Sequence, residues 1–517
     1  MSSAPVDPPQ ALAIIGAGFA GIGLGIQLRR AGYRDFTIFE RRDQVGGTWH
    51  DNVYPGVACD VPSHLYSYSF RPNPSWSRFF APGAEIQHYL QDAVQAEGLG
   101  EHLKLGVDVE SMHWNEADRL WEITSESRVH RAMLLVVACG RLSEPRFPDV
   151  PGMQQFQGPS FHSAAWESSF DPRGRSITVV GSGASSVQLV PHLAQTAKHV
   201  TVLQRTAPYI VPRNDHGYGT AERRMFHRIP EAMDALRARL FWKQEEGFAA
   251  RALIPEQLEA ARVRALGHLS TQVHDAGLLT QLTPKYELGC KRVLLSDTYY
   301  PALQEPNVTL VSSALERVEA HALVAADGTR VKADAIIYAT GFQSTHQPYA
   351  NRVRGVGGTL LSERWSEGMQ AFASTVVPGF PNMFVINGPN ASLGHNSAVV
   401  MIETQIKYIL GGVDYWSHTG RRPLDVLEEP AETYDSQIQA LSENTVWIRG
   451  GCDSWYLDEK TRRLSLIWPG PAADFRRRNG NFNPADYALC ERNIEPAPGH
   501  IDPDIKADEG SSVTAQP

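Results

Sequence analysis

The sequence predicts an α/β fold in which one strand–turn–helix unit occurs twice. In the first unit, Gly16, Gly18 and Gly21 follow the apolar residues 11–15. In the second, the run GSGASS follows the apolar residues 177–180 and supplies Gly181, Gly183 and Ser186. Each turn lies between a short β-rich run and a stretch compatible with a helix, which is typical of a turn that cradles a pyrophosphate. The pattern therefore predicts two Rossmann-like dinucleotide-binding domains.

The two units end on residues of opposite charge. Glu40 lies 24 residues beyond Gly16, and Arg205 lies 24 residues beyond Gly181. A carboxylate at that point accepts a hydrogen bond from a free ribose hydroxyl, whereas an arginine suits a ribose phosphate. We therefore expect FAD in the first domain and NADPH in the second. Ser186 replaces the third glycine of the second turn, but a serine is small enough for close packing of helix and strand.

A lone glycine motif is a weak signal, because glycine also marks ordinary tight turns. A purely structural role for each turn therefore stays open, more so for the second turn than for the first. The strand-rich and helix-compatible context on either side favours the dinucleotide interpretation in both cases.

The order of local patterns divides the chain into segments. We expect the first part of the FAD domain at 1–150, ending after the β-rich run 133–140, and the first part of the NADP domain at 151–217. Residues 218–289 have helical spacing and predict a helical insertion in the NADP domain. Its second part follows at 290–377, with strand signals from Asn307, a hairpin turn at Asp327-Gly328 and a final strand within 334–342. The FAD domain resumes at 378–492, and the Pro-, Asp-, Gly- and Ser-rich tail 493–517 is expected to be disordered.

Composition indicates a large intracellular enzyme. The 517 residues carry a net charge of −9 with both signs interspersed, which does not indicate a nucleic-acid surface. No apolar run approaches the roughly 20 residues that span a bilayer, and the start of the chain lacks the pattern of a signal peptide. The five cysteines are scattered without a CxxC pair, which argues against a zinc site or a redox dithiol and is typical of a reducing compartment. We expect a cytoplasmic location and no metal.

Four segments resemble the type I Baeyer–Villiger monooxygenases, a class B branch of the flavin-containing monooxygenase superfamily. The first signature matches at Gly47, Trp49, Tyr54, Pro55, Gly56 and Asp60, and the second at Phe156, Gly158, His162 and Trp166. Residues 334–342 are similar to a segment shared by flavin monooxygenases and include Thr340 and Gly341. Residues 282–303 resemble the family's Lys-Arg segment, with Lys291 and Arg292. One departure is Glu167, which stands where the second signature has Pro or Asp.

The resemblance implies an NADPH- and O₂-dependent enzyme that converts a ketone to an ester or lactone through an anionic C4a-peroxyflavin. It implies that Arg292 is the fixed cation beside that anion and that Asp60 orients it. An arginine keeps its proton, and a carboxylate can hold its planar donor group, so the physics agrees with this pairing. Each residue also has a plain structural alternative: Asp60 could cap a turn, and Lys291 and Arg292 could form a solvated basic face.

The resemblance assigns the remaining residues to cofactor binding. Gly47, Thr48 and Trp49 join the first glycine turn and Glu40 around FAD, with Thr340 and Gly341 also near the cofactors. Lys291, Arg205 and Thr206 are expected to bind the 2′-phosphate of NADPH. His162 and Trp166 are expected to form a hinge or linker between the domains. Trp455 resembles a tryptophan of the nicotinamide and substrate pocket, and a role as an ordinary core tryptophan stays open.

Three other functions remain as alternatives at this stage. A flavin-dependent N- or S-monooxygenase would use a protonated oxidant, and the Asp60–Arg292 pair is the feature that argues against it. An NADPH–flavin reductase is disfavoured by the missing CxxC, and a non-catalytic flavin-binding regulator by the retention of the expected site residues. The ketone itself, the selectivity and the oligomeric state cannot be read from the sequence.

Overall fold

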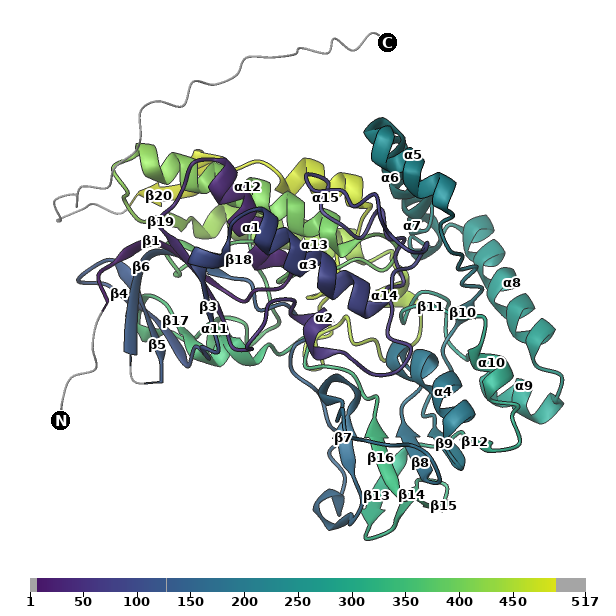
Figure 1. Ribbon diagram of the computed structural model, residues 1–517. Coiled ribbons are helices and arrows are strands. Elements are labelled where there is room, and N and C mark those ends of the chain that lie inside the picture. The colour runs from purple at the N-terminus through teal and green to yellow at the C-terminus, as the bar shows by residue number, and fades with distance from the viewer. Residues whose placement is uncertain (1–6, 127, 490–517) are drawn as a thin grey trace.

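The computed structural model describes residues 7–126 and 128–489. The expected tail 493–517 and Cys490 lie outside these residues. Two sheets and a group of helices build the molecule, with the first sheet and its helices at the upper left of Figure 1, the second sheet below, and the helices α5–α9 on the right.

The first sheet has eight strands in the order β17-β4-β5-β6-β1-β2-β3, and β18 also pairs with β6. The strands are β1 (Gln10–Ile15), β2 (Phe36–Glu40), β3 (Leu103–Leu105), β4 (Ser111–Asn115), β5 (Leu120–Ser125), β6 (Arg128–Val137), β17 (Val353–Arg354) and β18 (Met383–Val385). β1 is parallel to β2 and to β6, whereas β4 and β5 form an antiparallel extension. β2, which ends at Glu40, and β6, which contains most of the expected β-rich run at 133–140, are therefore the neighbours of β1.

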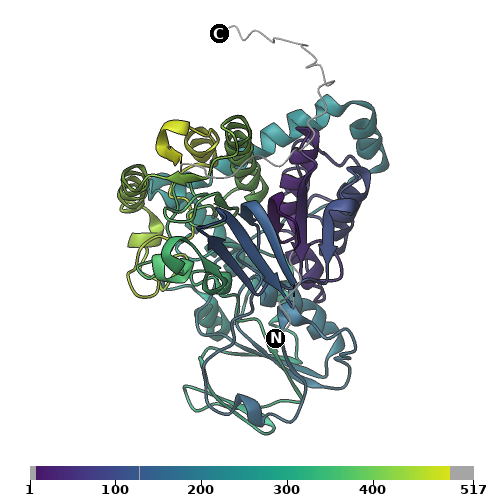
Figure 2. The ribbon, with the colours of Figure 1, turned by 90° about the vertical axis from the view of Figure 1, so that its left-hand side faces the viewer.

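Successive side chains of β1 enter two different cores. Leu12 and Ile14 pack with α1 (Phe19–Arg30), α3 (Gly83–Ala96) and α12 (Ala398–His418) on one face. Ala13 and Ile15 pack on the other face with the β4–β5 hairpin and with residues of the C-terminal part of the chain. Because both faces are covered, β1 is a continuous apolar run instead of an alternating one. Figure 2 shows this sheet between its covering layers.

The second sheet has five strands in the order β12-β9-β8-β16-β7, all parallel to their neighbours. They are β7 (Ser160–His162), β8 (Ser176–Val180), β9 (His199–Leu203), β12 (Val308–Val311) and β16 (Ala335–Tyr338), with α4 (Ala184–Thr196) after the second glycine turn and α10 (Tyr299–Ala302) beside it. A small antiparallel sheet is formed by β13 (Leu315–Glu319), β14 (Ala322–Ala325) and β15 (Arg330–Lys332). The turn between β14 and β15 contains Gly328 at φ +86°, as the Asp-Gly pair predicts.

Helices fill the segment that the sequence predicts as a helical insertion. They are α5 (Thr220–Arg228), α6 (Pro230–Glu245), α7 (Phe248–Arg251), α8 (Pro255–Gln272) and α9 (Ala276–Leu282), and they lie between the paired strands β10 (Ile210–Val211) and β11 (Leu294–Leu295). Met233, Leu240 and Phe241 of α6 are buried in the core of the first domain. The segment therefore bridges the two domains, because one end of it packs on the first domain.

The chain returns to the first domain earlier than the expected boundary at 378. β17 pairs with β4 of the first sheet, and Ala350, Val353 and Leu361 are buried in its second core. The remaining elements of this part are α2 (Thr48–Asp51), α11 (Leu361–Arg364), β19 (Leu424–Val426), α13 (Glu428–Ser442), α14 (Val446–Arg449), α15 (Ala472–Asn479) and β20 (Tyr487–Leu489). Among the described residues, no helix has the length and apolar character that crossing a bilayer requires.

Candidate active site

The first glycine turn has the shape that a pyrophosphate cradle requires. Gly16 has φ +109°, and a Cβ atom there would lie 2.7 Å from the carbonyl oxygen of Ala138. A Cβ on Gly21 would lie 1.9 Å from the carbonyl oxygen of Gly16, so neither position has room for a side chain. Gly18 precedes α1, whose first N–H groups point toward the turn. The turn therefore offers backbone donors and close approach to an anionic group.

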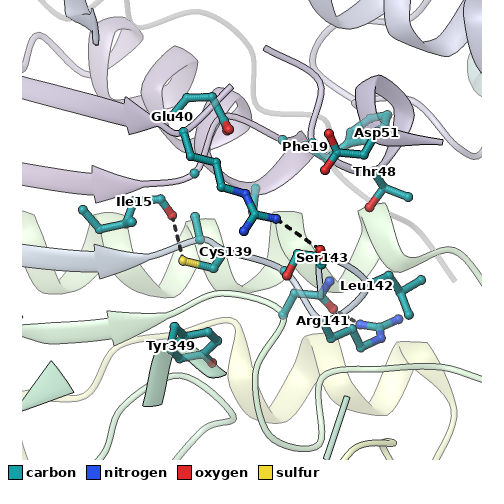
Figure 3. A pocket seen from close by; sticks show the side chains of 18 of the residues that line it. Ile15, Phe19, Glu40, Thr48, Asp51, Cys139, Arg141, Leu142, Ser143 and Tyr349 are labelled. Carbon is teal, nitrogen blue, oxygen red and sulfur yellow. Dashed lines mark hydrogen bonds between the residues drawn. The ribbon is translucent and has the colours of Figure 1, made fainter. Parts of the chain in front are cut away.

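Glu40 stands at the end of β2 beside this turn. Its carboxylate accepts hydrogen bonds from the backbone N–H groups of Ala17 (2.8 Å) and Arg42 (2.9 Å), which fix its position. The same side chain lines an elongated cavity with Gly16, Gly18, Gly47, Thr48 and Trp49. In Figure 3, Glu40 and Arg141 lie on opposite sides of this cavity. Gly47 faces Gly18 closely enough that a Cβ would lie 3.1 Å from the Cα of Gly18, so the two backbones approach each other tightly at this point of the cavity wall.

Several residues that line this cavity were not identified from the sequence. Arg41 forms an ion pair with Glu144, and the phenol of Tyr66 accepts a hydrogen bond from the indole of Trp49 at 3.3 Å. The others are Asp51, Cys139, Arg141 and Tyr349. Their only signal in the sequence is position: Arg41 follows Glu40, and Cys139 and Arg141 follow β6. The carboxyl ends of parallel strands are the usual place for ligand contacts.

The second glycine turn repeats this geometry. Gly181 has φ +114°, and a Cβ there would lie 2.5 Å from the carbonyl oxygen of Ala339. Gly183 precedes α4, and Ser186 is fully buried where the small side chain lets helix and strand approach. Thr206, expected to help bind the 2′-phosphate of NADPH, accepts a hydrogen bond through its carbonyl oxygen from Ser182 of this turn (3.0 Å).

Arg205 and Lys291 are brought together although 86 positions separate them in the sequence. Burial lowers the pKa of Lys291, and the nearby charge of Arg205 lowers it further. Lys291 also lies 5.2 Å from the ring centre of Tyr286. Among the described residues neither cation forms an ion pair, so both are available to an anionic group at the mouth of the second glycine turn.

Asp60 and Arg292 form an ion pair between the two glycine turns. Oδ2 of Asp60 accepts a hydrogen bond from Nε of Arg292 (2.8 Å) and lies 2.6 Å from Nη2 in the same ion pair, so both nitrogens contact one oxygen. The charge of Asp60 raises the pKa of Arg292 above its ordinary value, which keeps the guanidinium protonated. This geometry leaves Nη1 of Arg292 outside the pair.

Tyr456 and Trp455 lie beside this pair. The charges of Arg292, Arg251 and Arg141 all act on the phenol of Tyr456, which is buried. The ring of Trp455 lies 4.6 Å from that of Tyr456 but is itself exposed, so Trp455 is not a core tryptophan.

A disulfide connects the loop that carries Trp455 and Tyr456 to the Lys291–Arg292 segment. Cys290 and Cys452 are bonded, and Ser454 donates a hydrogen bond to the carbonyl oxygen of Cys290 at 2.9 Å. This pairing differs from the expectation of a reducing compartment that the sparse cysteines suggested. Spacing could not reveal it because 162 residues separate the two cysteines. Cys59 and Cys139 are free.

The expected hinge residues are His162, at the end of the edge strand β7 that pairs with β16, and Trp166, which follows a few residues later. His162 is buried, and its Nδ1 accepts a hydrogen bond from the backbone N–H of Ala164 (3.1 Å). The ring of Trp166 packs edge-to-face on that of Phe161. Burial lowers the pKa of His162 to about 4, so its imidazole is neutral near pH 7. The backbone of Gly341 contacts the imidazole ring of His162.

Thr340, in the same segment, donates a hydrogen bond to the carbonyl oxygen of Arg146. The interaction joins the end of the second sheet to the chain that leaves the first domain. Thr340 therefore lies at the crossing between the domains.

The chain is similar to known proteins over nearly its whole length. A family model described as pyridine nucleotide-disulphide oxidoreductase matches residues 13–222. A Baeyer–Villiger monooxygenase of Streptomyces coelicolor is 41% identical over 512 residues, which cover 97% of each chain. Among solved structures, the OTEMO complex with FAD and NADP has a TM-score of 0.81 at 25% identity and covers 94% of this chain and 100% of that one. Cyclohexanone monooxygenase from Rhodococcus sp. Phi1, bound to NADP⁺, has a TM-score of 0.81 at 26% identity, with 92% and 97% covered. The relative at 41% identity decides the classification: this chain belongs to the Baeyer–Villiger monooxygenase family.

Proposed function

We propose that this protein is an FAD-dependent monooxygenase that uses NADPH and O₂ to convert a ketone into an ester or lactone. Its family and the cofactors named with OTEMO support this assignment. In the balanced reaction, one oxygen atom enters the C–C bond beside the carbonyl. The other atom leaves as water, with two electrons from NADPH and one further proton.

The residues around the first cavity fit FAD. The glycine turn at Gly16 and Gly18 would receive the pyrophosphate, and Glu40 would accept a hydrogen bond from the adenosine ribose. A Cβ at Gly16 or Gly21 would collide with backbone, so these positions keep the turn open for a ligand. When bound, the flavin supplies hydride acceptance and the activation of O₂.

The residues around the second turn fit NADPH. Gly181 and Gly183 would receive its pyrophosphate, and Arg205 with Lys291 would bind the 2′-phosphate, because these two cations lie near each other and form no ion pair within the described residues. We assign His162 and Trp166, which belong to the second domain, the role of coupling the positions of the two cofactors.

The Asp60–Arg292 pair is the observation that carries the proposed reaction. A ketone gains negative charge on its oxygen when a nucleophile adds to the carbonyl carbon, and a fixed cation stabilises that charge. Asp60 holds Nε and Nη2 of Arg292, so the guanidinium keeps one orientation and need not reorganise during the reaction.

The test is product analysis with isotopically labelled O₂. Purified enzyme, NADPH and a ketone should give an ester or lactone that carries one labelled oxygen atom, with one NADPH consumed for each product. Oxidation of a sulfide or an amine with no ketone product would favour the N- or S-monooxygenase instead. NADPH consumption that yields only hydrogen peroxide would point to a reductase or oxidase.

A further inference from the structure

The charged residues that line the FAD cavity are paired with one exception. Arg41 is paired with Glu144, and Arg352 with Asp108 (3.0 Å). Asp51 forms an ion pair with Arg42 at 2.9 Å, and Glu40 accepts two backbone hydrogen bonds. Arg141 is the exception, since within residues 7–126 and 128–489 it forms no ion pair.

The unpaired part of Arg141 is one edge of its guanidinium. Nη1 donates a hydrogen bond to Oδ1 of Asn387. Nε is buried and has no hydrogen-bond partner, and no described residue accepts from Nη2. Nε and Nη2 lie on the same edge of the planar group, and two parallel donors on one edge match the two oxygens of a carboxylate. A buried donor without an acceptor is costly, which is why the edge calls for a ligand.

The edge lies where the cavity meets the reaction site. The charges of Arg141 and Arg292 act on each other and on the phenol of Tyr456. Figure 3 places Arg141 beside Leu142 and Ser143, on the side of the cavity away from Glu40 and therefore away from the expected adenosine ribose. Asp60 pairs with Arg292, whereas Arg141 has no carboxylate partner within the described residues, so this end of the cavity has an excess of positive charge. Burial lowers the pKa of Arg141 to about 10, which leaves it charged near pH 7.

A second arginine near Tyr456 does not offer such an edge. Arg251 donates through Nη1 to the carbonyl oxygen of Gly247 and through Nη2 to that of Gly394. These bonds tie α7 to the 394 loop, so Arg251 has a structural role. Arg141 therefore differs from Arg251 in having an edge whose donors find no acceptor within the described residues.

We propose that Arg141 binds a carboxylate carried by the substrate, so that the preferred substrates are ketones with an anionic group. This inference rests on the proposed ketone oxygenation. A planar pair of acceptor atoms for Arg141 could come from a substrate carboxylate or from the reduced flavin, and the experiment below separates these two sources.

The experiment compares two ketones of the same shape. One is a cyclohexanone with a carboxylate on the ring carbon opposite the carbonyl, and the other is the corresponding neutral carboxamide. The enzymes compared are the wild type, Arg141→Gln, Arg141→Lys and Asn387→Asp. Asn387 has φ +60°, a conformation that both Asn and Asp tolerate, so Asn387→Asp keeps the shape and supplies Arg141 with an internal carboxylate. Arg173→Gln is the matched control, since Arg173 is exposed and paired with Asp171 in the second domain.

We expect the wild type to prefer the carboxylate. Arg141→Gln should lower kcat/KM for the carboxylate on the order of tenfold to a hundredfold and that for the carboxamide by less than about threefold, as expected for loss of hydrogen bonds to a charged group. Asn387→Asp should produce the same selective loss, and Arg141→Lys a smaller one. The Kd of the carboxylate, measured from the perturbed flavin spectrum of the oxidised enzyme without NADPH, should rise in parallel. Arg173→Gln should change none of these values.

Three results would overturn the inference or its basis in different ways. Equal losses on both ketones, with slower flavin reduction by NADPH when no ketone is present, would assign Arg141 to the flavin. A wild type that oxygenates the carboxamide as well as the carboxylate would remove the preference itself. A wild type that oxygenates neither ketone but does oxidise a sulfide would defeat the proposed function, while the Kd measurement would still show whether Arg141 binds a carboxylate.

Discussion

Nε of Arg292 donates a hydrogen bond to Oδ2 of Asp60, and Nη2 lies 2.6 Å from the same oxygen, although 232 residues of sequence separate the two side chains. The pair is partly accessible, with side-chain exposures of 31% for Arg292 and 25% for Asp60, so solvent or a ligand can reach it. A fixed and reachable cation is suited to stabilising charge that develops on a bound group.

Loss of this cation should affect catalysis more than folding. Arg292→Ala should lower the rate of ester formation by about 10²–10³-fold while FAD stays bound, because the lost group stabilises charge in the reaction and does not form the cavity wall. The measurement is product formation beside NADPH consumption and hydrogen peroxide release. Asp60→Asn should give a smaller loss, since Arg292 stays charged but is less firmly oriented. Unchanged ester formation in Arg292→Ala would remove its assigned role.

Replacement of Arg205 should affect NADPH selectively. Arg205→Ala should raise KM for NADPH on the order of tenfold or more and leave KM for NADH nearly unchanged, because only NADPH carries the 2′-phosphate. Lys291→Ala should act in the same direction. Steady-state kinetics with both cofactors measures the effect, and Arg173→Ala serves as a surface control. Equal changes for NADPH and NADH would show that Arg205 does not bind the phosphate.

The Cys290–Cys452 disulfide should stabilise the loop that carries Trp455 and Tyr456. Cys452→Ala should lower the free energy of unfolding by about 2–5 kcal/mol, because the bond closes a loop of 162 residues in the unfolded chain. Thermal unfolding with and without a reductant measures this effect. The reductant should lower the Tm of the wild type and leave that of Cys452→Ala unchanged. Peptide mapping without reduction should recover the linked pair, and recovery of both cysteines as free thiols would contradict the structure.

Acid should loosen the contact between the helical segment and the first domain. His64 is buried against Tyr218 and Phe226, and Arg237 of α6 donates to its carbonyl oxygen at 2.9 Å. Burial, with a smaller effect from Arg237, lowers the pKa of His64 from 6.5 to about 4. The unfolded chain therefore binds a proton that the folded chain does not between these two pH values. The contribution of neutral His64 to the free energy of unfolding is therefore fully present above pH 6.5 and is lost as the pH falls toward 4.

The size of this effect can be measured with a variant that cannot titrate. At pH 5 the His64 contribution to the loss is about 2 kcal/mol, so His64→Gln should lose that much less stability than the wild type between pH 7.5 and pH 5. Denaturant unfolding at the two pH values gives the difference. His88→Gln is the control, since His88 is 72% exposed. An identical pH dependence in the wild type and His64→Gln would show that His64 is not the group involved.

Local patterns predicted much of the fold and part of the site. The two glycine turns and the hairpin at Gly328 are short-range features, and the structure has the positive φ angles that these turns require at Gly16, Gly181 and Gly328. The charges of Glu40 and Arg205 are also read directly from the local sequence. The boundary at 378 was wrong because β17 is two residues long and gives no periodic signal before it pairs with β4. The cavity residues Arg41, Glu144 and Arg141 lie in loops that have no periodicity to interpret.

By itself, the sequence determined the strand–turn–helix units and the charge at the end of each, because these depend on neighbours within a few tens of residues. Family resemblance, and not spacing, suggested the pairing of Asp60 with Arg292. Only the tertiary structure decided which distant loops meet: Arg141 with Asn387 across 246 residues, and Cys290 with Cys452 across 162. Such contacts depend on how the two sheets and the helical segment pack, and packing is a property of the whole chain that no local pattern of residues encodes.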